Sequence, residues 1–412
     1  MKQTEIGLIP DDWEVKSLGE IGEPCMCKRI LKEQTSPTGD IPFYKIGTFG
    51  GIPDAYISRE LFEQYKEQYN YPKKGTLLLS AAGTIGRVVV FDGKDSYFQD
   101  SNIVWIDNDE TKVTNDFLFY CYSRMQWKTE EGGIISRLYN ANLKSTSFIA
   151  PKSLAEQKRI AKALSDIDAL ISTTEKLIQK KNNIKQGAMQ NLLTGKKRLP
   201  GFGDKQTDLF VPNGTHTKEV KDVSPEQIRL SAKMKQTELG EIPEDWEVKS
   251  LGEMLKIGHG KDYKNLKSGN VPVYGTGGYM TSVNDFLYEG ETVCIGRKGT
   301  IDKPQYHSGK IWTVDTLFYT YDFKSLNPKY LFYKFCLIDW LSMNEASGVP
   351  SLTAKNIEDI QITIPTEEEQ TAIANVLSSM DKEIETLNTK LEKYRNLKTA
   401  MMQQLLTGKI RL

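Results

Sequence analysis

The sequence has few of the residues from which disulfide frameworks and metal centres are built. Its 412 residues include five cysteines and three histidines. The cysteines are scattered along the chain, and Cys25-Met26-Cys27 has no second Cys or His pair at zinc-ligand spacing. This pattern predicts free thiols in a reducing compartment and no metal site.

Long apolar runs are also missing. No uninterrupted stretch approaches the ~20 residues that a membrane span needs. The segment Met1–Glu5 contains no apolar run of a signal peptide. We therefore expect a cytoplasmic protein with no membrane partner. The length and the hydrophobic fraction of 39% predict two to four globular domains.

The sequence has no surplus of charge of either sign. Lys plus Arg and Asp plus Glu both number 54. Because a nucleic-acid reader usually carries a basic face, this total does not favour DNA binding. The distribution is uneven, however. Residues 152–199 carry 11 basic and 4 acidic side chains, whereas residues 1–151 carry 17 and 21.

No catalytic motif is present. Asn327–Tyr330 lacks the second proline of an amino-methyltransferase loop, and Gly258–Lys261 lacks the glycine and the Ser/Thr of a phosphate-binding loop. There is no nucleophile elbow, and no Gly-x-Gly-x-x-Gly. Scattered Asp and Glu could still assemble a nuclease site in space. The absences favour a binding protein that has no catalytic residues and no cofactor of its own.

What the sequence does contain is a repeat of about 180 to 200 residues. Met1–Glu20 and Met234–Glu253 are identical at 17 of 20 positions. Gln157–Leu199 and Gln370–Leu412 align without a gap, with 20 of 43 positions identical. Both copies end in Leu-Leu-Thr-Gly-Lys-x-Arg-Leu. Near-identical ends predict a shared kind of partner, while divergent middles predict different ligands.

The divergent middles keep short landmarks. Strands predicted over Thr76–Leu79 and Thr292–Ile295 each precede a Gly-Thr-Ile triplet. The landmark pairs are Ile41–Tyr44 with Val271–Tyr274, Gly83–Ile85 with Gly299–Ile301, and Leu118–Tyr120 with Leu331–Tyr333. We expect an α+β fold with two similar globular domains, over residues 1–150 and 234–364. A polar, Gly/Pro-punctuated linker is expected over residues 200–233.

Each copy ends in a segment that predicts a long helix, over residues 151–199 and 365–412. Ser153-x-x-Glu156 and Thr366-x-x-Glu369 are capping boxes, and Gly195 and Gly408 are suited to end the helices. Apolar residues recur in alternating steps of four and three, which is the coiled-coil pattern. This seam comprises Ile160, Leu164, Ile167, Ile171, Ile178, Ile184 and Leu192 in the first helix and Ile373, Leu377, Met380, Ile384, Leu387, Leu391 and Tyr394 in the second.

About 43 residues make a helix of ~65 Å, which exceeds ordinary packing within one domain. The two helices could dimerise with a second chain. Their matched seams favour antiparallel pairing within one chain, which would separate the two domains about a pseudo-twofold axis.

These duplicated motifs, taken in their order, resemble the specificity subunits of Type I restriction–modification enzymes. The resemblance covers nearly the whole chain. It rests on the Ile-Pro-x-Asp-Trp openings and the Leu-Leu-Thr-Gly-Lys endings of both copies, and on the helix starts Pro151, Gln157, Ile160-Ala161 and Pro365, Gln370, Ile373-Ala374.

The resemblance implies two target-recognition domains, each reading one half of a split sequence in double-stranded DNA. It also implies two modification (methyltransferase) subunits and a restriction/translocase subunit as partners. S-adenosylmethionine, ATP and Mg²⁺ are then expected in those partners only. The alternatives are a duplicated protein-binding scaffold without a DNA role and a self-contained restriction enzyme.

Candidate DNA-binding residues adjoin the landmarks, because Arg and Lys are the usual partners of guanine in the major groove. Each could equally be a solvated charge or a core tyrosine. Trp13 and Trp246 lie in the copied openings and are assigned to structure. The DNA-binding candidates are Tyr44, Lys45 and Arg87 in the first domain and Tyr274, Arg297 and Lys298 in the second.

Overall fold

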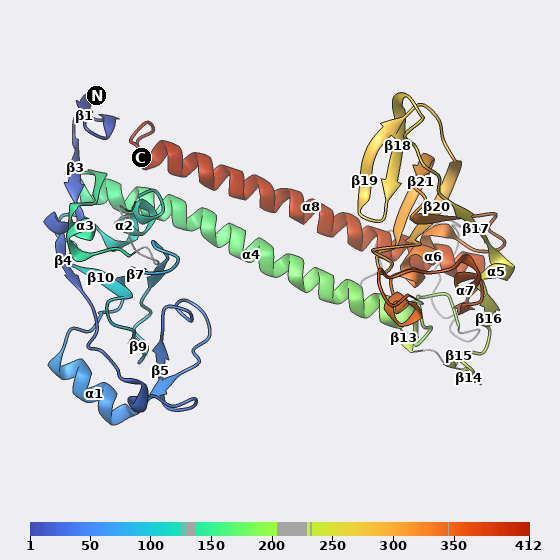
Figure 1. The fold of residues 1–412 in the computed structure, drawn as a ribbon, viewed down its shortest axis with the longest axis horizontal. Helices are drawn as coiled ribbons and strands as arrows, with labels where there is room; N and C mark the ends of the chain where they lie inside the picture. The colour runs from blue at the N-terminus through green and yellow to red at the C-terminus, as the bar shows by residue number, and fades with distance from the viewer. Residues whose placement is uncertain (126, 128–136, 204–228, 231–232, 345) are drawn as a thin grey trace, which may run out of the picture. The chain divides into compact units, whose positions relative to one another are not determined.

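The computed structural model describes residues 1–125, 127, 137–203, 229–230, 233–344 and 346–412. They form two compact units (Figure 1). One unit comprises Met1–Thr174 with Lys390–Leu412, and the other comprises Glu175–Thr389. Each unit therefore contains segments from both copies of the repeat. Most of the linker expected over residues 200–233 lies outside the described residues.

The first unit is an α+β domain that continues into a long helix. Its elements are β1 (Lys2–Thr4), β2 (Gly7–Ile9), β3 (Trp13–Ser17), η1 (Leu18–Glu20), β4 (Gly22–Cys25), η2 (Lys32–Gln34), β5 (Ile41–Tyr44), β6 (Tyr56–Ile57), α1 (Arg59–Gln68), β7 (Leu77–Ser80), β8 (Val88–Val90), β9 (Tyr97–Phe98), β10 (Ile103–Asn108), α2 (Asn115–Tyr122), α3 (Asn140–Ser145), β11 (Ser147–Pro151) and the first part of α4 (Leu154–Leu192).

The second unit has a similar order of elements, without a counterpart of α1. Its elements are β12 (Lys197–Arg198), β13 (Arg229–Leu230), β14 (Met234–Thr237), β15 (Gly240–Pro243), β16 (Glu247–Ser250), α5 (Leu251–Met254), β17 (Lys256–His259), β18 (Ser268–Gly275), β19 (Gly278–Val283), β20 (Tyr288–Gly296), β21 (Gln305–Thr313), β22 (Leu317–Tyr321), α6 (Pro328–Phe335), η4 (Trp340–Met343), α7 (Ala354–Glu358), β23 (Gln361–Ile364) and the first part of α8 (Glu367–Leu405).

The two domains share one sheet topology, as the landmarks predict. The second domain has a six-stranded sheet in the order β17-β22-β20-β21-β18-β19. The first domain splits the same order into β4-β10-β7-β8 and β6-β5-β9. The split follows from a polar turn, in which Lys94 N donates to Asp92 Oδ1 and Gly93 has a φ of 87°. This turn interrupts the strand that is continuous as β21 in the second domain.

The copied opening of each repeat forms a strand beside the start of a long helix. β3 pairs with β11, and β16 pairs with β23. A fully buried glutamine then fastens the helix to its domain. Gln157 accepts from Thr114 N and donates to Pro151 O, while Gln370 accepts from Asn327 N and donates to Pro365 O. Because these amides have no access to water, their bonds fix each helix start in one orientation.

The two helices pair antiparallel, as the packing within each unit shows. In the first unit, Ile160 and Leu164 of α4 share a core with Leu405 and Leu406 at the end of α8. In the second unit, Leu192 near the end of α4 shares a core with Ile373 and Leu377 at the start of α8. Each helix has 39 residues, a length of ~58 Å.

The ending of each copy packs on the opening of the other. Gly408 has a φ of 69°, and a Cβ there would lie 2.5 Å from Pro10 Cγ. Gly195 has a φ of 72°, and a Cβ there would lie 2.5 Å from Pro243 Cδ. Glycine is therefore required at both positions by backbone conformation and by close approach.

At each of these two contacts an arginine binds carboxylates of the opening and of the long helix. We call the two arginine contacts the latches. In the second latch, Arg198 binds Asp245 at 2.8 and 2.9 Å, and its Nε donates to Glu369 at 2.8 Å. Glu369 also accepts from Trp246 Nε1 at 3.1 Å. All of these groups except Asp245 are buried. Such paired, planar contacts are the strongest that arginine makes with carboxylates.

In the first latch, Arg411 binds Asp12 at 2.9 and 2.6 Å and also binds both oxygens of Glu156. This arginine is 41% exposed, whereas Arg198 is 5% exposed. Trp13 is buried, but its Nε1 has no hydrogen-bond partner among the described residues. The two latches use the same residue types, and the second is the more deeply buried.

The latches correct the prediction of two complete capping boxes. The hydroxyl half is present, since Glu156 N donates to Ser153 Oγ and Glu369 N donates to Thr366 Oγ1, both at 3.4 Å. The prediction of the reciprocal carboxylate bonds is wrong, because Glu369 and Glu156 accept hydrogen bonds from the latch arginines instead. Among the described residues, no helix is long and apolar enough to cross a membrane.

We expect Arg198→Ala to lower the free energy of unfolding by about 3–5 kcal/mol, because the fully buried Glu369 would lose its compensating charge. Arg411→Ala should have a smaller effect, since its removal admits water to Glu156. Urea unfolding of both variants measures the difference. Arg198→Lys is the control, which keeps the charge but not the planar fork. An equal loss of unfolding free energy in the two alanine variants would contradict the predicted difference between the two latches.

Candidate nucleic-acid interface

The first domain brings its predicted DNA-binding residues to neighbouring loops. Tyr44 ends β5 and stacks on Phe98 with the ring planes 16° apart. Lys45 begins the following turn, and its Nζ lies 2.8 Å from Asp54. Arg87 precedes β8, and one of its guanidinium nitrogens donates to Phe49 O at 2.9 Å. Arg87 therefore also braces the loop that follows β5.

A hollow of about 270 Å³ lies beside this arginine. It is lined by Ile46, Gly47, Phe49, Ser80, Gly83, Thr84 and Arg87. Two loops meet here, because a Cβ on Gly83 would have Ile46 as its nearest neighbour, at 3.9 Å. Tyr44 and Lys45 are not among the lining residues.

In the second domain, Tyr274 and Arg297 contact one loop, since Val314 N donates to Tyr274 O and Arg297 binds the adjacent residue Asp315. Tyr274 ends β18 and lines the large hollow of this domain. Arg297 follows β20, and its guanidinium donates to Asp315 O at 3.2 Å. Lys298 forms an isolated bridge with Ser351. Arg297 and Lys298 are not among the residues that line the hollow.

The shared topology identifies the second-domain counterpart of Arg87. Ser80 pairs with Ile103 at the end of β7, and Gly296 pairs with Leu317 at the end of β20. The Gly-Thr-Ile triplets follow at the same distance from these two positions. Two residues beyond the triplets stand Arg87 and Lys303, so Lys303 is the equivalent cation. Extending the triplet alignment by two residues would have found it.

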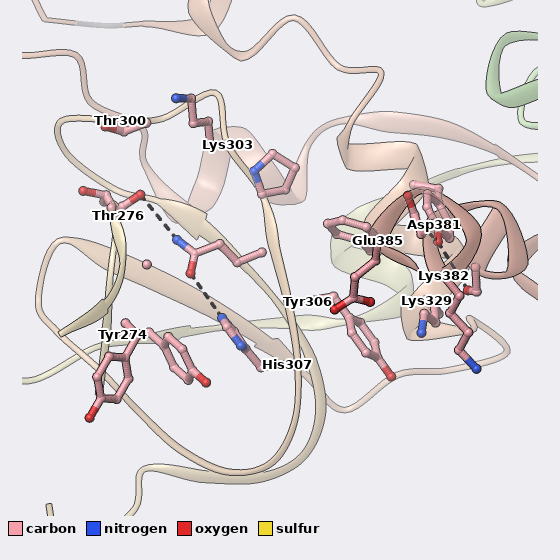
Figure 2. A pocket seen from close by; sticks show the side chains of 18 residues that line it. Tyr274, Thr276, Thr300, Lys303, Tyr306, His307, Lys329, Asp381, Lys382 and Glu385 are labelled. Carbon is pink, nitrogen blue, oxygen red and sulfur yellow. Dashed lines mark hydrogen bonds between the residues drawn. The ribbon is translucent and has the colours of Figure 1, made fainter. Parts of the chain in front are cut away.

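The large hollow of the second domain has a volume of about 740 Å³ (Figure 2). Its walls come from the β18–β19 hairpin, the segment before β21, and helices α6 and α8. It contains three lysines and two acidic side chains, together with several tyrosines. The charged and aromatic lining residues are Tyr274, Tyr279, Lys303, Tyr306, His307, Lys329, Phe332, Tyr333, Asp381, Lys382 and Glu385.

An aromatic stack forms part of this hollow. The rings of Tyr274 and His307 are 3.7 Å apart with planes inclined by 25°. His307 Nε2 lies 3.2 Å from Gln305 Oε1, which accepts when this nitrogen carries the proton. Burial lowers the pKa of His307 from its usual 6.5 to about 4. The imidazole is therefore neutral at pH 7 and adds no charge to the hollow.

The charged side chains of the hollow differ in their contact partners. Lys329 Nζ lies 4.8 Å from the centre of the Tyr306 ring, and the Tyr333 hydroxyl donates to Asp381 at 2.6 Å. Asp381 also pairs with Lys185. In nucleic-acid-binding proteins, cations bind phosphates and neighbouring aromatic side chains contact bases. Among the described residues, no group of His, Cys, Asp and Glu side chains could hold a metal ion.

The predicted seam residues lie on the covered side of their helices. Ile160, Leu164, Ile167, Leu192, Ile373, Leu377 and Leu391 are buried, and Ile171, Ile178, Ile184, Met380, Ile384, Leu387 and Tyr394 are half-buried. Thr174 is buried, with its hydroxyl bonded to Leu170 O. The other interruption, Lys181, pairs with Glu383 at 2.7 Å.

The family described as Type I restriction modification DNA specificity domain matches residues 10–186 and 243–393. A Haemophilus influenzae protein, provisionally named a type I restriction enzyme specificity subunit, is 59% identical over 160 residues; the match covers 39% of this chain and 41% of that protein. A Methanocaldococcus jannaschii protein, provisionally named the MjaX specificity subunit, is 28% identical over 458 residues. That match covers 100% of this chain and 96% of the relative.

The crystal structure of the S subunit of a Type I restriction–modification system from M. genitalium has the same fold. The TM-score is 0.61 at 16% sequence identity, with 98% of each chain covered. This likeness supports the two-domain α+β architecture.

The pKa of His307 predicts a loss of stability in acid. Its pKa is lower in the folded chain than in the unfolded chain, so the unfolded chain binds more protons between pH 6.5 and 4. The free energy of unfolding should therefore fall as the pH decreases through this range, by about 2 kcal/mol for this group. His307→Phe keeps the stack on Tyr274 and should reduce the drop in urea midpoint between pH 7 and pH 4.5. An unchanged drop would show that the imidazole is not protected from protonation.

Proposed function

Because the chain belongs to the Type I restriction modification DNA specificity family, we propose that its two domains read the two halves of one split sequence in double-stranded DNA. The observation that carries this proposal is one sheet topology with two different reading surfaces. Arg87 stands beside a small hollow in the first domain, whereas Lys303 stands beside a large, lysine-rich hollow in the second. Unlike surfaces on a repeated frame suit an asymmetric, bipartite site.

The chain recognises DNA and assembles with other subunits of a restriction–modification system. We further propose that it carries no catalytic group of its own. Its partners are two modification subunits, which supply S-adenosylmethionine, and restriction/translocase subunits, which use ATP and Mg²⁺. The complex acts on cellular DNA in the cytoplasm. Since the domains carry no basic surplus, the partners would provide much of the attraction to phosphate.

Mapping methylated bases in the host genome tests the function directly. Deletion of the gene for this chain should abolish methylation at one bipartite sequence, and its return should restore the same sequence. Methylation that persists without the chain would contradict DNA recognition and favour a protein-binding scaffold.

The duplicated frame predicts that one chain binds two modification subunits. The purified chain alone should transfer no methyl group, and titration with the modification subunit should end at two per chain. Native mass spectrometry measures the ratio. The two latches offer a matched pair of variants, Asp12→Asn and Asp245→Asn, that test whether each half of the frame supports its own partner. A complex that saturates with one partner would contradict the proposal.

The two equivalent cations should act on different halves of the DNA site. Arg87→Ala should relax base preference in one half only, and Lys303→Ala in the other, because a lost base contact costs about 1–3 kcal/mol of discrimination. Methylation mapping with each variant measures both halves at once. Arg297→Ala is the matched control, since Arg297 lies outside the hollow. A larger loss from Arg297→Ala than from Lys303→Ala would favour the assignment made from sequence.

A further inference from the structure

The two most exposed large apolar side chains among the described residues occupy the same connection in the two domains. Ile52 is 87% exposed and Tyr279 is 65% exposed. Ile52 lies between the paired strands β5 and β6, and Tyr279 is the second residue of β19, where it pairs with Tyr274 of β18 next to the turn. A single exposed apolar residue is ordinary. The same exposure at one topological position in two diverged domains is a repeated feature.

Each of these side chains follows a pair of glycines. We call Gly50-Gly51-Ile52 the first tip and Gly277-Gly278-Tyr279 the second tip. Gly50 has a φ of 75° and Gly278 a φ of 105°. These left-handed conformations favour glycine and let the chain turn sharply at the point that presents the apolar side chain.

A side-chain donor from another segment of the same domain holds the backbone before each tip. Arg87 donates to Phe49 O at 2.9 Å, directly before the first tip. Gln305 Nε2 donates to Gly275 O at 2.9 Å and to Thr276 O at 3.4 Å, and Thr276 directly precedes the second tip. A loop that is fixed before binding loses less conformational entropy when it meets a ligand. These hydrogen bonds therefore support a role for the two tips in contacting a ligand.

The surroundings of the second tip indicate the chemistry of the ligand. Tyr279 lines the large hollow together with Lys303, Lys329 and Lys382. Its ring lies 6.4 Å from the ring of Tyr274, edge to face. Cations suit phosphates, and exposed apolar groups suit base edges such as the thymine methyl group. The first tip is likewise near a cation, since Lys45 pairs with Asp54 two residues beyond Ile52.

We propose that the two tips are the apolar base-reading contacts of the chain, with Ile52 reading one half-site and Tyr279 reading the other. The inference rests on the proposed DNA recognition and names residues for it. Each side chain packs against base edges in a groove of double-stranded DNA, while the nearby cations hold the phosphates. The difference between Ile and Tyr at equivalent tips gives the two domains different preferences.

The test replaces each tip in the full chain and maps methylation in the host that carries the complete system. Ile52→Ser should raise the methylation of sequences altered at one or two positions of a single half-site by about tenfold, the size expected for loss of one base contact. Tyr279→Ser should do the same in the opposite half-site. Ile52→Val and Tyr279→Phe, which keep the apolar surface, should preserve the original sequence.

Ile6→Ser and Leu239→Ser are the matched controls, because they make the same chemical change at exposed, equivalent positions of the copied openings. They should leave both half-sites unchanged. Unaltered sequence choice in both tip variants, or equal loss in both halves, would overturn the assignment while DNA recognition stands. Methylation that survives deletion of the whole chain would overturn both, so the two failures are distinguishable.

Discussion

The fold depends on two arginine contacts that join the end of each repeat to the start of the other. Arg198 holds Asp245 and Glu369, and Arg411 holds Asp12 and Glu156. In each latch, one carboxylate lies in the turn before the opening strand and the other in the first turn of a long helix. A single guanidinium therefore fixes the angle between strand and helix. Everything that the domains present to a ligand is positioned on that junction.

The frame and the reading surfaces obey different constraints. The frame requires glycine at two positions, since Gly195 and Gly408 meet Pro243 and Pro10 at distances that exclude a Cβ. The surfaces are free to vary because they extend from sheet edges and turns. The polar turn at Asp92-Gly93 divides one sheet, yet the strand order is unchanged. The same scaffold can thus hold a small hollow beside Arg87 in one domain and a large, lysine-rich hollow in the other.

Much of this architecture follows from sequence, and the exceptions have physical causes. The repeat and the alternating seam predicted the paired domains and the antiparallel helices. The latches were missed because Glu156 and Glu369 stand at capping positions, where a local partner is the usual one. Lys303 was not among the predicted residues, because the cations Arg297 and Lys298 adjoin the same Gly299–Ile301 landmark. The arginine partners of Glu156 and Glu369 lie far from them in the sequence, so no local pattern indicates these contacts.

The composition of the first unit has a consequence for synthesis. This unit comprises Met1–Thr174 and Lys390–Leu412, so the ribosome makes all of the second unit between its two parts. Domains generally fold in the order in which they emerge. Here the opening domain emerges first and must wait for Leu405, Leu406 and Arg411 to cover its core. During that interval Trp13 and the start of α4 lack their cover, which makes the nascent chain a natural client for chaperones.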